Sequence, residues 1–181
     1  LLGYSIGCRL GLSILTLQAN WVEQVFLMAP DGIRRNFYYE WATKNFFGKR
    51  IFQFICAYPD KFIRFVNQLS KMRLITKSKM KFLEKNLKDE KYRQQVFKVW
   101  NFLSPHTPRK AIVHYYLRKN PVHLHLLMGE QDAIFPPAIG QSYIQGIKNA
   151  TLHVLPCGHY FHQEDIVAQV CQIIKSTTSS L

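Results

Sequence analysis

The sequence predicts an α/β protein with a mostly parallel sheet and a helical segment inserted into it. Short apolar runs alternate with amphipathic stretches at both ends of the 181-residue chain, and strands that alternate with helices pair in parallel through right-handed crossovers. Between the two ends, apolar residues recur three and four positions apart, which is the period of a helix. With 48% apolar residues, the chain is able to bury a core.

The first seven residues, Leu1 to Gly7, predict the end of a buried strand followed by a serine on a tight turn. Ser5 has a glycine two residues away on each side, and glycine lets backbones approach closely and adopt unusual φ/ψ angles. The turn opens a helix that we expect over residues 8–18. The first N–H groups of this helix, that of Ile6 above all, would point at a negative charge forming beside the Ser5 hydroxyl.

A second strand and a group of helices follow. Residues 25–29 form a continuous apolar run with turn chemistry directly after it, which is typical of a strand buried on both faces. From Arg34 onward we expect four or five amphipathic helices, with breaks at Gly48, at 58–60 and at 104–108. The apolar positions that predict them are Tyr38, Trp41, Ala42 and Phe46, then Phe62, Phe65, Val66 and Leu69, then Met80, Leu83 and Leu87, and finally Val96, Val99, Trp100 and Leu103.

Strands and helices alternate again after Thr107. This threonine and Pro108 are a suitable N-cap and first residue for a helix that ends near Arg118. The elements expected after it are a strand over 121–129, a helix from 136 to 147, a strand over 151–156, a helix over 164–175 and a frayed tail. Three polar residues, Ser5, Asp132 and His159, then fall in loops at the carboxyl ends of strands, where α/β sheets carry their functional groups.

Positive charge and aromatic residues are concentrated in the middle of the chain. Residues 31–121 contain 21 Lys and Arg against 6 Asp and Glu, and 18 of the 25 aromatic residues, which indicates an inserted module. Such a segment suits anionic substrates or lipid headgroups, and so contact with a membrane surface. The alternative is that the aromatic residues pack the helices against one another while Lys and Arg lie on the solvated outer faces. No recognition motif supports a nucleic-acid partner.

The cysteines and the hydropathy restrict the class of protein further. The four cysteines, Cys8, Cys56, Cys157 and Cys171, lack C-x-x-C spacing, and we expect them to be reduced, buried thiols. No apolar run reaches the length of a membrane span. We expect a cytoplasmic location.

The sequence resembles the α/β-hydrolase family at three motifs. Gly3-Tyr4-Ser5-Ile6-Gly7 is similar to the family's nucleophile elbow, Gly129-Glu130-Gln131-Asp132 to the loop that carries its acid, and Gly158-His159 to the loop that carries its histidine. The order serine, aspartate, histidine is also the family's. The resemblance implies a core formed by residues 1–30 and 107–181, and a helical cap formed by residues 31–106.

The resemblance covers only the second part of the family's fold. Strands one to four of the family core are missing, and with them the loop that provides the second oxyanion-hole donor. Leu1 and Leu2 would form an unpaired apolar edge, which favours aggregation. We expect the chain to be a fragment of a longer enzyme and, expressed alone, to be poorly soluble or inactive.

The implied function is that of a serine hydrolase acting on a carboxylic ester or thioester. Ser5 would be the nucleophile, His159 the base and Asp132 its partner, with Glu130 and Asp31 as competing acids. The alternatives are cleavage of an amide or carbon–carbon bond, or a catalytically inactive fragment or interaction module.

We expect no cofactor and no metal. His123 and His125 alternate along a strand, but no third ligand has suitable spacing. The histidines for which we expect no catalytic task are His106, His114, His123, His125, His153 and His162.

Overall fold

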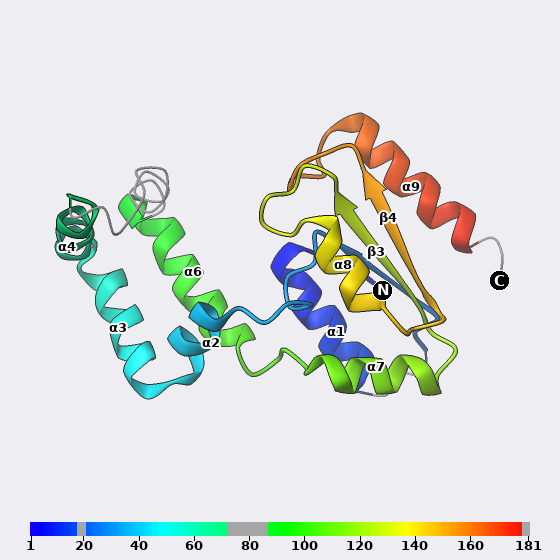
Figure 1. Ribbon diagram of the computed structural model, residues 1–181, viewed down its shortest axis with the longest axis horizontal. Helices are drawn as coiled ribbons and strands as arrows, with labels where there is room; N and C mark the ends of the chain where they lie inside the picture. Colours follow the sequence, from blue (N-terminus) through cyan, green and yellow to red (C-terminus); the bar gives the residue numbers. More distant parts are fainter. Residues whose placement is uncertain (18–20, 72–86, 179–181) are drawn as a thin grey trace. The chain divides into compact units, whose positions relative to one another are not determined.

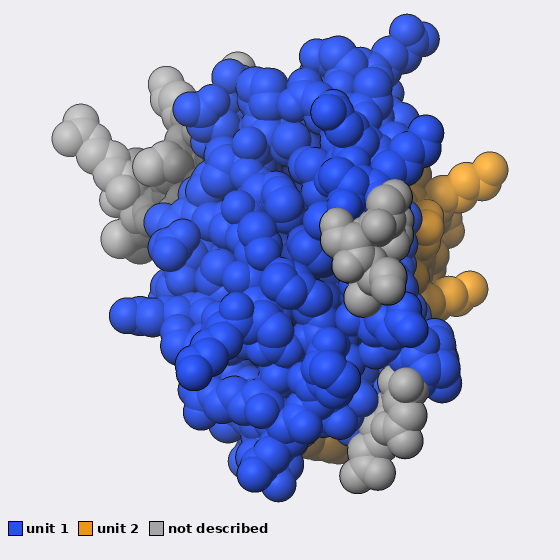
Figure 2. Space-filling model, turned by 90° about the vertical axis from the view of Figure 1, so that its right-hand side faces the viewer, with its two compact units in different colours: residues 1–35, 106–181 blue, residues 36–105 orange. Residues whose placement is uncertain are grey.

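The computed structural model describes residues 1–17, 21–71 and 87–178. The chain divides into two compact units, which Figure 2 distinguishes by colour. Unit 1 comprises Leu1–Arg35 and His106–Leu181, and unit 2 comprises Asn36–Pro105.

Unit 1 contains, within the described ranges, a sheet of four parallel strands in the order β1-β2-β3-β4 (Figure 1). The strands are β1 (Leu2–Tyr4), β2 (Gln24–Met28), β3 (His123–Gly129) and β4 (Ala150–Leu155). Leu27 lies opposite Leu126, and Leu126 lies opposite Leu152. The predicted parallel α/β architecture is therefore confirmed.

Helices cover both faces of this sheet (Figure 1). The short 3₁₀ turn η1 (Ser5–Gly7) leads into α1 (Cys8–Thr16), and the later helices are α7 (Lys110–Lys119), α8 (Pro137–Ile144) and α9 (Glu164–Thr178). Val25 and Leu27 of β2 pack in a core cluster with residues of α1, α7 and α8, whereas Phe26 packs in a second cluster with α9. Because neighbouring residues of a strand point to opposite faces, β2 is apolar on both faces from Val25 to Met28.

Unit 2 is helical in its described part. Its elements are α2 (Phe37–Lys44), α3 (Phe46–Ala57), α4 (Pro59–Lys71) and α6 (Glu90–Leu103). Short polar side chains at Asn36, Asn45 and Asp89 accept hydrogen bonds from the first N–H groups of α2, α3 and α6, as N-caps do. Tyr39 packs edge-on against Trp100 and donates its hydroxyl to the Trp100 carbonyl oxygen at 3.0 Å.

The expected break at Gly48 is wrong. The break falls at Asn45, which ends α2 and caps α3, and Gly48 lies inside α3. Gly48 is required there for packing, because a Cβ atom would overlap the carbonyl group of Trp41. The helix expected around Met80 and Leu83 lies outside the described residues.

Three further expectations differ from the structure. The helix expected from Pro108 begins at Lys110, and Thr107 does not cap it, because the Thr107 hydroxyl oxygen accepts a hydrogen bond from Arg9 instead. The closing helix continues beyond residue 175 to Thr178. Cys171 is exposed, while the other cysteines are buried and all four are free.

None of the helices in the described ranges combines the length and apolar character that a bilayer crossing requires.

Three histidines form a stacked cluster on the face of the sheet that carries Phe26. His125 is buried, stacks on the Phe26 ring at a centroid distance of 4.5 Å and lies beside His123 and His153. Its Nδ1 is 3.1 Å from His153 Nε2, and among the described residues its Nε2 has no hydrogen-bond partner. Burial, together with the smaller effects of the neighbouring His123 and His153, lowers the pKa of His125 to about 4.

This cluster predicts that the protein loses stability between about pH 6.5 and pH 4. In that window the unfolded chain takes up protons that the folded His125 excludes, so the free energy of unfolding falls as the pH falls, by up to about 3 kcal/mol from this residue. Urea unfolding followed across this pH range measures the slope. His125→Leu should flatten it, whereas His162→Gln, at an exposed position, should leave it unchanged.

Candidate active site

Ser5 follows β1 directly and is the first residue of the 3₁₀ turn, where its backbone is strained. Its φ angle is 48°, in the left-handed region that non-glycine residues rarely adopt. Its carbonyl oxygen accepts hydrogen bonds from the N–H groups of Cys8 and Asp31, the latter at 3.2 Å. The Ser5 turn is therefore held by its own helix and by the loop that follows β2.

The two glycines around Ser5 have different roles. A Cβ atom on Gly3 would lie 3.1 Å from Cys8 Cα and 3.3 Å from Leu27 Cδ2, so Gly3 allows the close approach of β1 and α1. Gly7 has ordinary helical angles, and a Cβ atom there would meet nothing within 4 Å among the described residues. The expectation that both glycines serve close approach is therefore wrong for Gly7.

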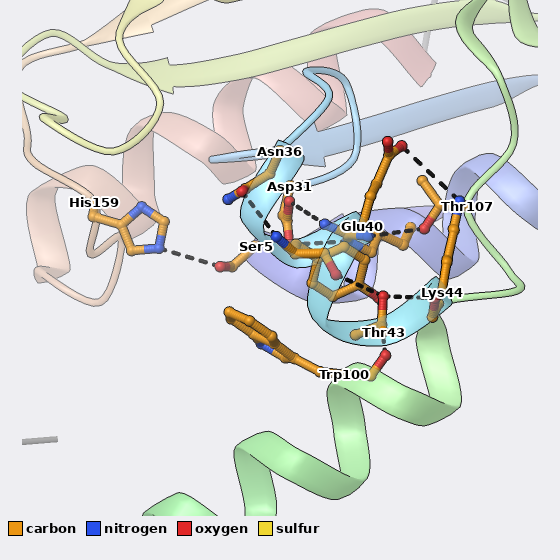
Figure 3. Close-up of polar contacts among 12 residues, drawn as sticks. Ser5, Asp31, Asn36, Glu40, Thr43, Lys44, Trp100, Thr107 and His159 are labelled. Carbon is orange, nitrogen blue, oxygen red and sulfur yellow. Dashed lines mark hydrogen bonds and ion pairs between the residues drawn. The ribbon is translucent and has the colours of Figure 1, made fainter. Parts of the chain in front are cut away.

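The structure brings Ser5, His159 and Asp132 together in one chain of hydrogen bonds. Ser5 Oγ is 3.2 Å from His159 Nε2, and Figure 3 shows these two side chains facing each other. His159 Nδ1 is 2.9 Å from Asp132 Oδ2 on the other side of the ring. The Asp132 side chain is fully buried, and that of His159 is 16% exposed, so the imidazole is reachable from solvent while its partner is not.

The loop after β3 prepares the Asp132 carboxylate for this contact. Its second oxygen, Oδ1, accepts the N–H groups of Ile134 at 2.8 Å and Phe135 at 3.0 Å. Burial by itself would raise the pKa of Asp132, but the hydrogen bonds from Phe135, His159 and Ile134 together lower the pKa below its ordinary value. Asp132 is therefore a carboxylate at neutral pH and can hold the Nδ1–H group of His159.

A close backbone contact sets the loops of Asp132 and His159 side by side. A Cβ atom on Gly129, at the end of β3, would overlap the carbonyl oxygens of Cys157 and Gly158. Two hydrogen bonds join the same loops, from Glu130 N to Leu155 O at 2.8 Å and from Gln131 N to Cys157 O at 3.0 Å. Glycine at position 129 is thus the condition for this approach.

Tyr4 is a site residue that the sequence reasoning missed. Its hydroxyl donates to the carbonyl oxygen of His159 at 3.0 Å, and its ring centroid lies 6.1 Å from that of His159. The ring of Phe135 lies 5.8 Å from the imidazole. The position of Tyr4 directly before Ser5 was the available signal, but its contact with a loop 155 residues away exists only in the fold.

The competing acids lie elsewhere. Glu130 is exposed, and both carboxylate oxygens of Asp31 accept hydrogen bonds from Arg9. Ile6 lies in the turn directly after Ser5, and its role as an oxyanion donor stays a prediction. Across the described residues, no group of three or more His, Cys, Asp or Glu side chains is placed to hold a metal ion.

We compared the sequence and the structure with those of known proteins. The sequence matches no family model and no curated protein. The structure is similar to a thermophilic esterase from Thermogutta terrifontis (TM-score 0.58, 18% identity, 99% of this chain and 64% of the esterase). It is also similar to the meta-cleavage product hydrolase CumD from Pseudomonas fluorescens (TM-score 0.54, 14% identity, 99% of this chain and 64% of CumD).

A third similar structure is MGS-M2, an α/β hydrolase from a Medee basin deep-sea metagenome library (TM-score 0.56, 13% identity, 96% of this chain and 62% of MGS-M2). The chain thus spans less than two thirds of the length of these structures. The chain therefore has the α/β-hydrolase fold and corresponds to the second part of that fold.

The close approach at Gly129 generates a prediction with a matched control. Gly129→Ala should lower the free energy of unfolding by about 2 kcal/mol or more, because the added methyl group meets backbone that no rotamer change can move. Gly158→Ala, where a Cβ atom would meet nothing within 4 Å among the described residues, should unfold at nearly the wild-type urea concentration. Equal loss of stability in the two variants would contradict the role of Gly129.

Proposed function

We propose that this chain carries the catalytic residues of a serine hydrolase that cleaves a carboxylic ester or thioester. The observation that supports the proposal is the hydrogen-bond chain from Ser5 Oγ through the His159 imidazole to the buried Asp132 carboxylate. A hydroxyl, a base and a group that orients the base, in this order and at these distances, are the requirements of nucleophilic acyl transfer.

The proposed reaction begins with acyl transfer to the serine. His159 Nε2 accepts the Ser5 hydroxyl proton as Oγ bonds to the carbonyl carbon of the substrate. The tetrahedral intermediate then expels the alcohol or thiol, which receives that proton from His159. Throughout this step Asp132 holds the Nδ1–H group and stabilises the imidazolium charge. The products are an acyl-serine and the free leaving group.

Water completes the cycle by the same groups. His159 takes a proton from a water molecule, the resulting oxygen attacks the acyl-serine, and the proton returns to Ser5 Oγ as the carboxylic acid leaves. In both halves the N–H group of Ile6 is the proposed donor to the oxyanion, a contact worth about 3 kcal/mol of barrier in enzymes of this type.

A second candidate is hydrolysis of a different bond, an amide or a carbon–carbon bond. The similarity to a meta-cleavage product hydrolase supports this second candidate, because the same three side chains serve several chemistries on one fold. The candidate of another class is a catalytically inactive fragment or interaction module.

We also propose residues 31–106 as a cap that selects a hydrophobic or anionic acyl substrate. In support, α3 exposes Phe46 and Phe47 next to the exposed cations Lys49 and Arg50 and contains no acidic residue. Exposed aromatics among cations also suit an anionic membrane surface. A cytoplasmic location is proposed on the basis of the four free cysteines.

A fluorophosphonate probe tests the serine hydrolase directly. The full-length gene product should be labelled covalently, because the probe reacts with a serine that is activated by a base. Ser5→Ala should abolish labelling while the melting temperature stays near that of the wild type. A folded wild-type protein that does not react would favour the interaction module, and hydrolysis of p-nitrophenyl esters of graded length would then be absent too.

The two acidic residues of one loop provide a matched pair of variants. Asp132→Asn should lower kcat for ester hydrolysis by about 10,000-fold, because an amide stabilises the wrong imidazole tautomer. Glu130→Gln changes an exposed carboxylate in the same loop and should leave kcat within about twofold. Steady-state kinetics with one ester substrate measures both, and a larger loss in Glu130→Gln would assign the acid to Glu130.

A further inference from the structure

Arg9 is a buried cation with no part in the proposed chemistry. It lies in α1, four residues after Ser5, and is 3% exposed. A guanidinium group loses its hydration when it is buried, so its burial is tolerated only where its N–H groups find other acceptors. A buried ion pair by itself is weak grounds for a stabilising role, because desolvation offsets most of the attraction. The role of Arg9 therefore depends on the residues that it joins.

Arg9 joins three segments that are distant in the sequence. Its Nε and Nη2 atoms donate to the two carboxylate oxygens of Asp31 at 2.9 and 2.8 Å, and its Nη1 atom donates to Thr107 Oγ1 at 3.0 Å. Asp31 follows β2, and Thr107 lies between unit 2 and α7 in the sequence. The planar guanidinium fork matches a carboxylate in two places at once, so Arg9 binds both oxygens of the Asp31 carboxylate.

Asp31 in turn holds the turn that bears the nucleophile. Its N–H group donates to the Ser5 carbonyl oxygen at 3.2 Å, and Ser5 has the strained φ of 48°. The next residue, Gly32, has φ 104°, and a Cβ atom there would lie 3.0 Å from Arg9 Cγ. The loop is therefore shaped around the Arg9 side chain, and the same loop supplies a hydrogen bond to Ser5.

We propose that Arg9 is a positioning residue for Ser5, acting through Asp31, and that Thr107 helps to hold the guanidinium group in place. This inference rests on the proposed serine hydrolase function and deepens it. Strained backbone persists only where its surroundings determine it. When the Arg9–Asp31 pair is weakened, Ser5 relaxes towards ordinary φ angles and its Oγ leaves the line to His159 Nε2.

The test uses the full-length gene product with Arg9→Lys and Asp31→Asn. Lysine keeps the charge but loses the fork, and asparagine keeps the backbone N–H group and the shape but loses an acceptor. In both variants kcat per active site, titrated with fluorophosphonate, should fall about 10-fold or more, with KM within about twofold. Thr107→Val removes one hydrogen bond and should cause a smaller loss.

A stability-matched control separates positioning from general destabilisation. Val113→Ala opens a cavity at a fully buried position of α7 and should lower the melting temperature while kcat per active site stays at the wild-type value. If Arg9→Lys and Asp31→Asn behave like Val113→Ala, with stability lost and kcat per active site retained, the positioning role is overturned.

The backbone ¹³C chemical shifts of Ser5 provide a readout that needs no activity, because they report its φ angle. They should move away from the left-handed values in Arg9→Lys and Asp31→Asn and stay unchanged in Val113→Ala. A wild-type protein that neither labels nor hydrolyses esters would remove the proposed function. In that case unchanged Ser5 shifts in Arg9→Lys and Asp31→Asn would overturn the positioning role, and moved shifts would support it.

Discussion

Parallel pairing of the strands is the constraint on which the candidate site depends. Because all four described strands run in one direction, the loops that follow them meet at one edge of the sheet. The residues that these loops carry are Ser5, Asp31, Asp132 and His159. Two of the contacts that result, from Ser5 to His159 and from His159 to Asp132, join residues at least 27 positions apart. A sheet with one strand reversed would send one of these groups to the opposite edge.

Close backbone approach and local strain refine what the sheet brings together. Gly129 lets the loops of Asp132 and His159 touch, and Gly3 lets β1 lie against α1. Ser5 then adopts a positive φ angle that its neighbours hold in place through its carbonyl oxygen. The strain is local, whereas one of the groups that maintain it, the Asp31 N–H group, comes from the loop after β2, so the geometry of Ser5 does not depend on its own turn alone.

Two buried polar side chains also depend on residues that are distant in the sequence. His125 and Arg9 are both buried, but His125 is deprotonated among aromatic neighbours while Arg9 is matched to a carboxylate. The first makes stability depend on pH, and the second links the loop after β2 to the serine turn. Neither role follows from residue type, because a histidine on a strand and an arginine on a helix are most often solvated.

By itself, the sequence determined the alternation of strands and helices, the presence of a helical segment between them and the placement of Ser5, Asp132 and His159 after strands. Periodicity and turn chemistry are local properties, and they carry this information. Only the tertiary structure decided that Gly48 packs inside α3 and that Thr107 binds Arg9 instead of capping a helix. These outcomes depend on atoms from distant segments, since a hydroxyl or a missing side chain is used by whichever group the fold brings against it.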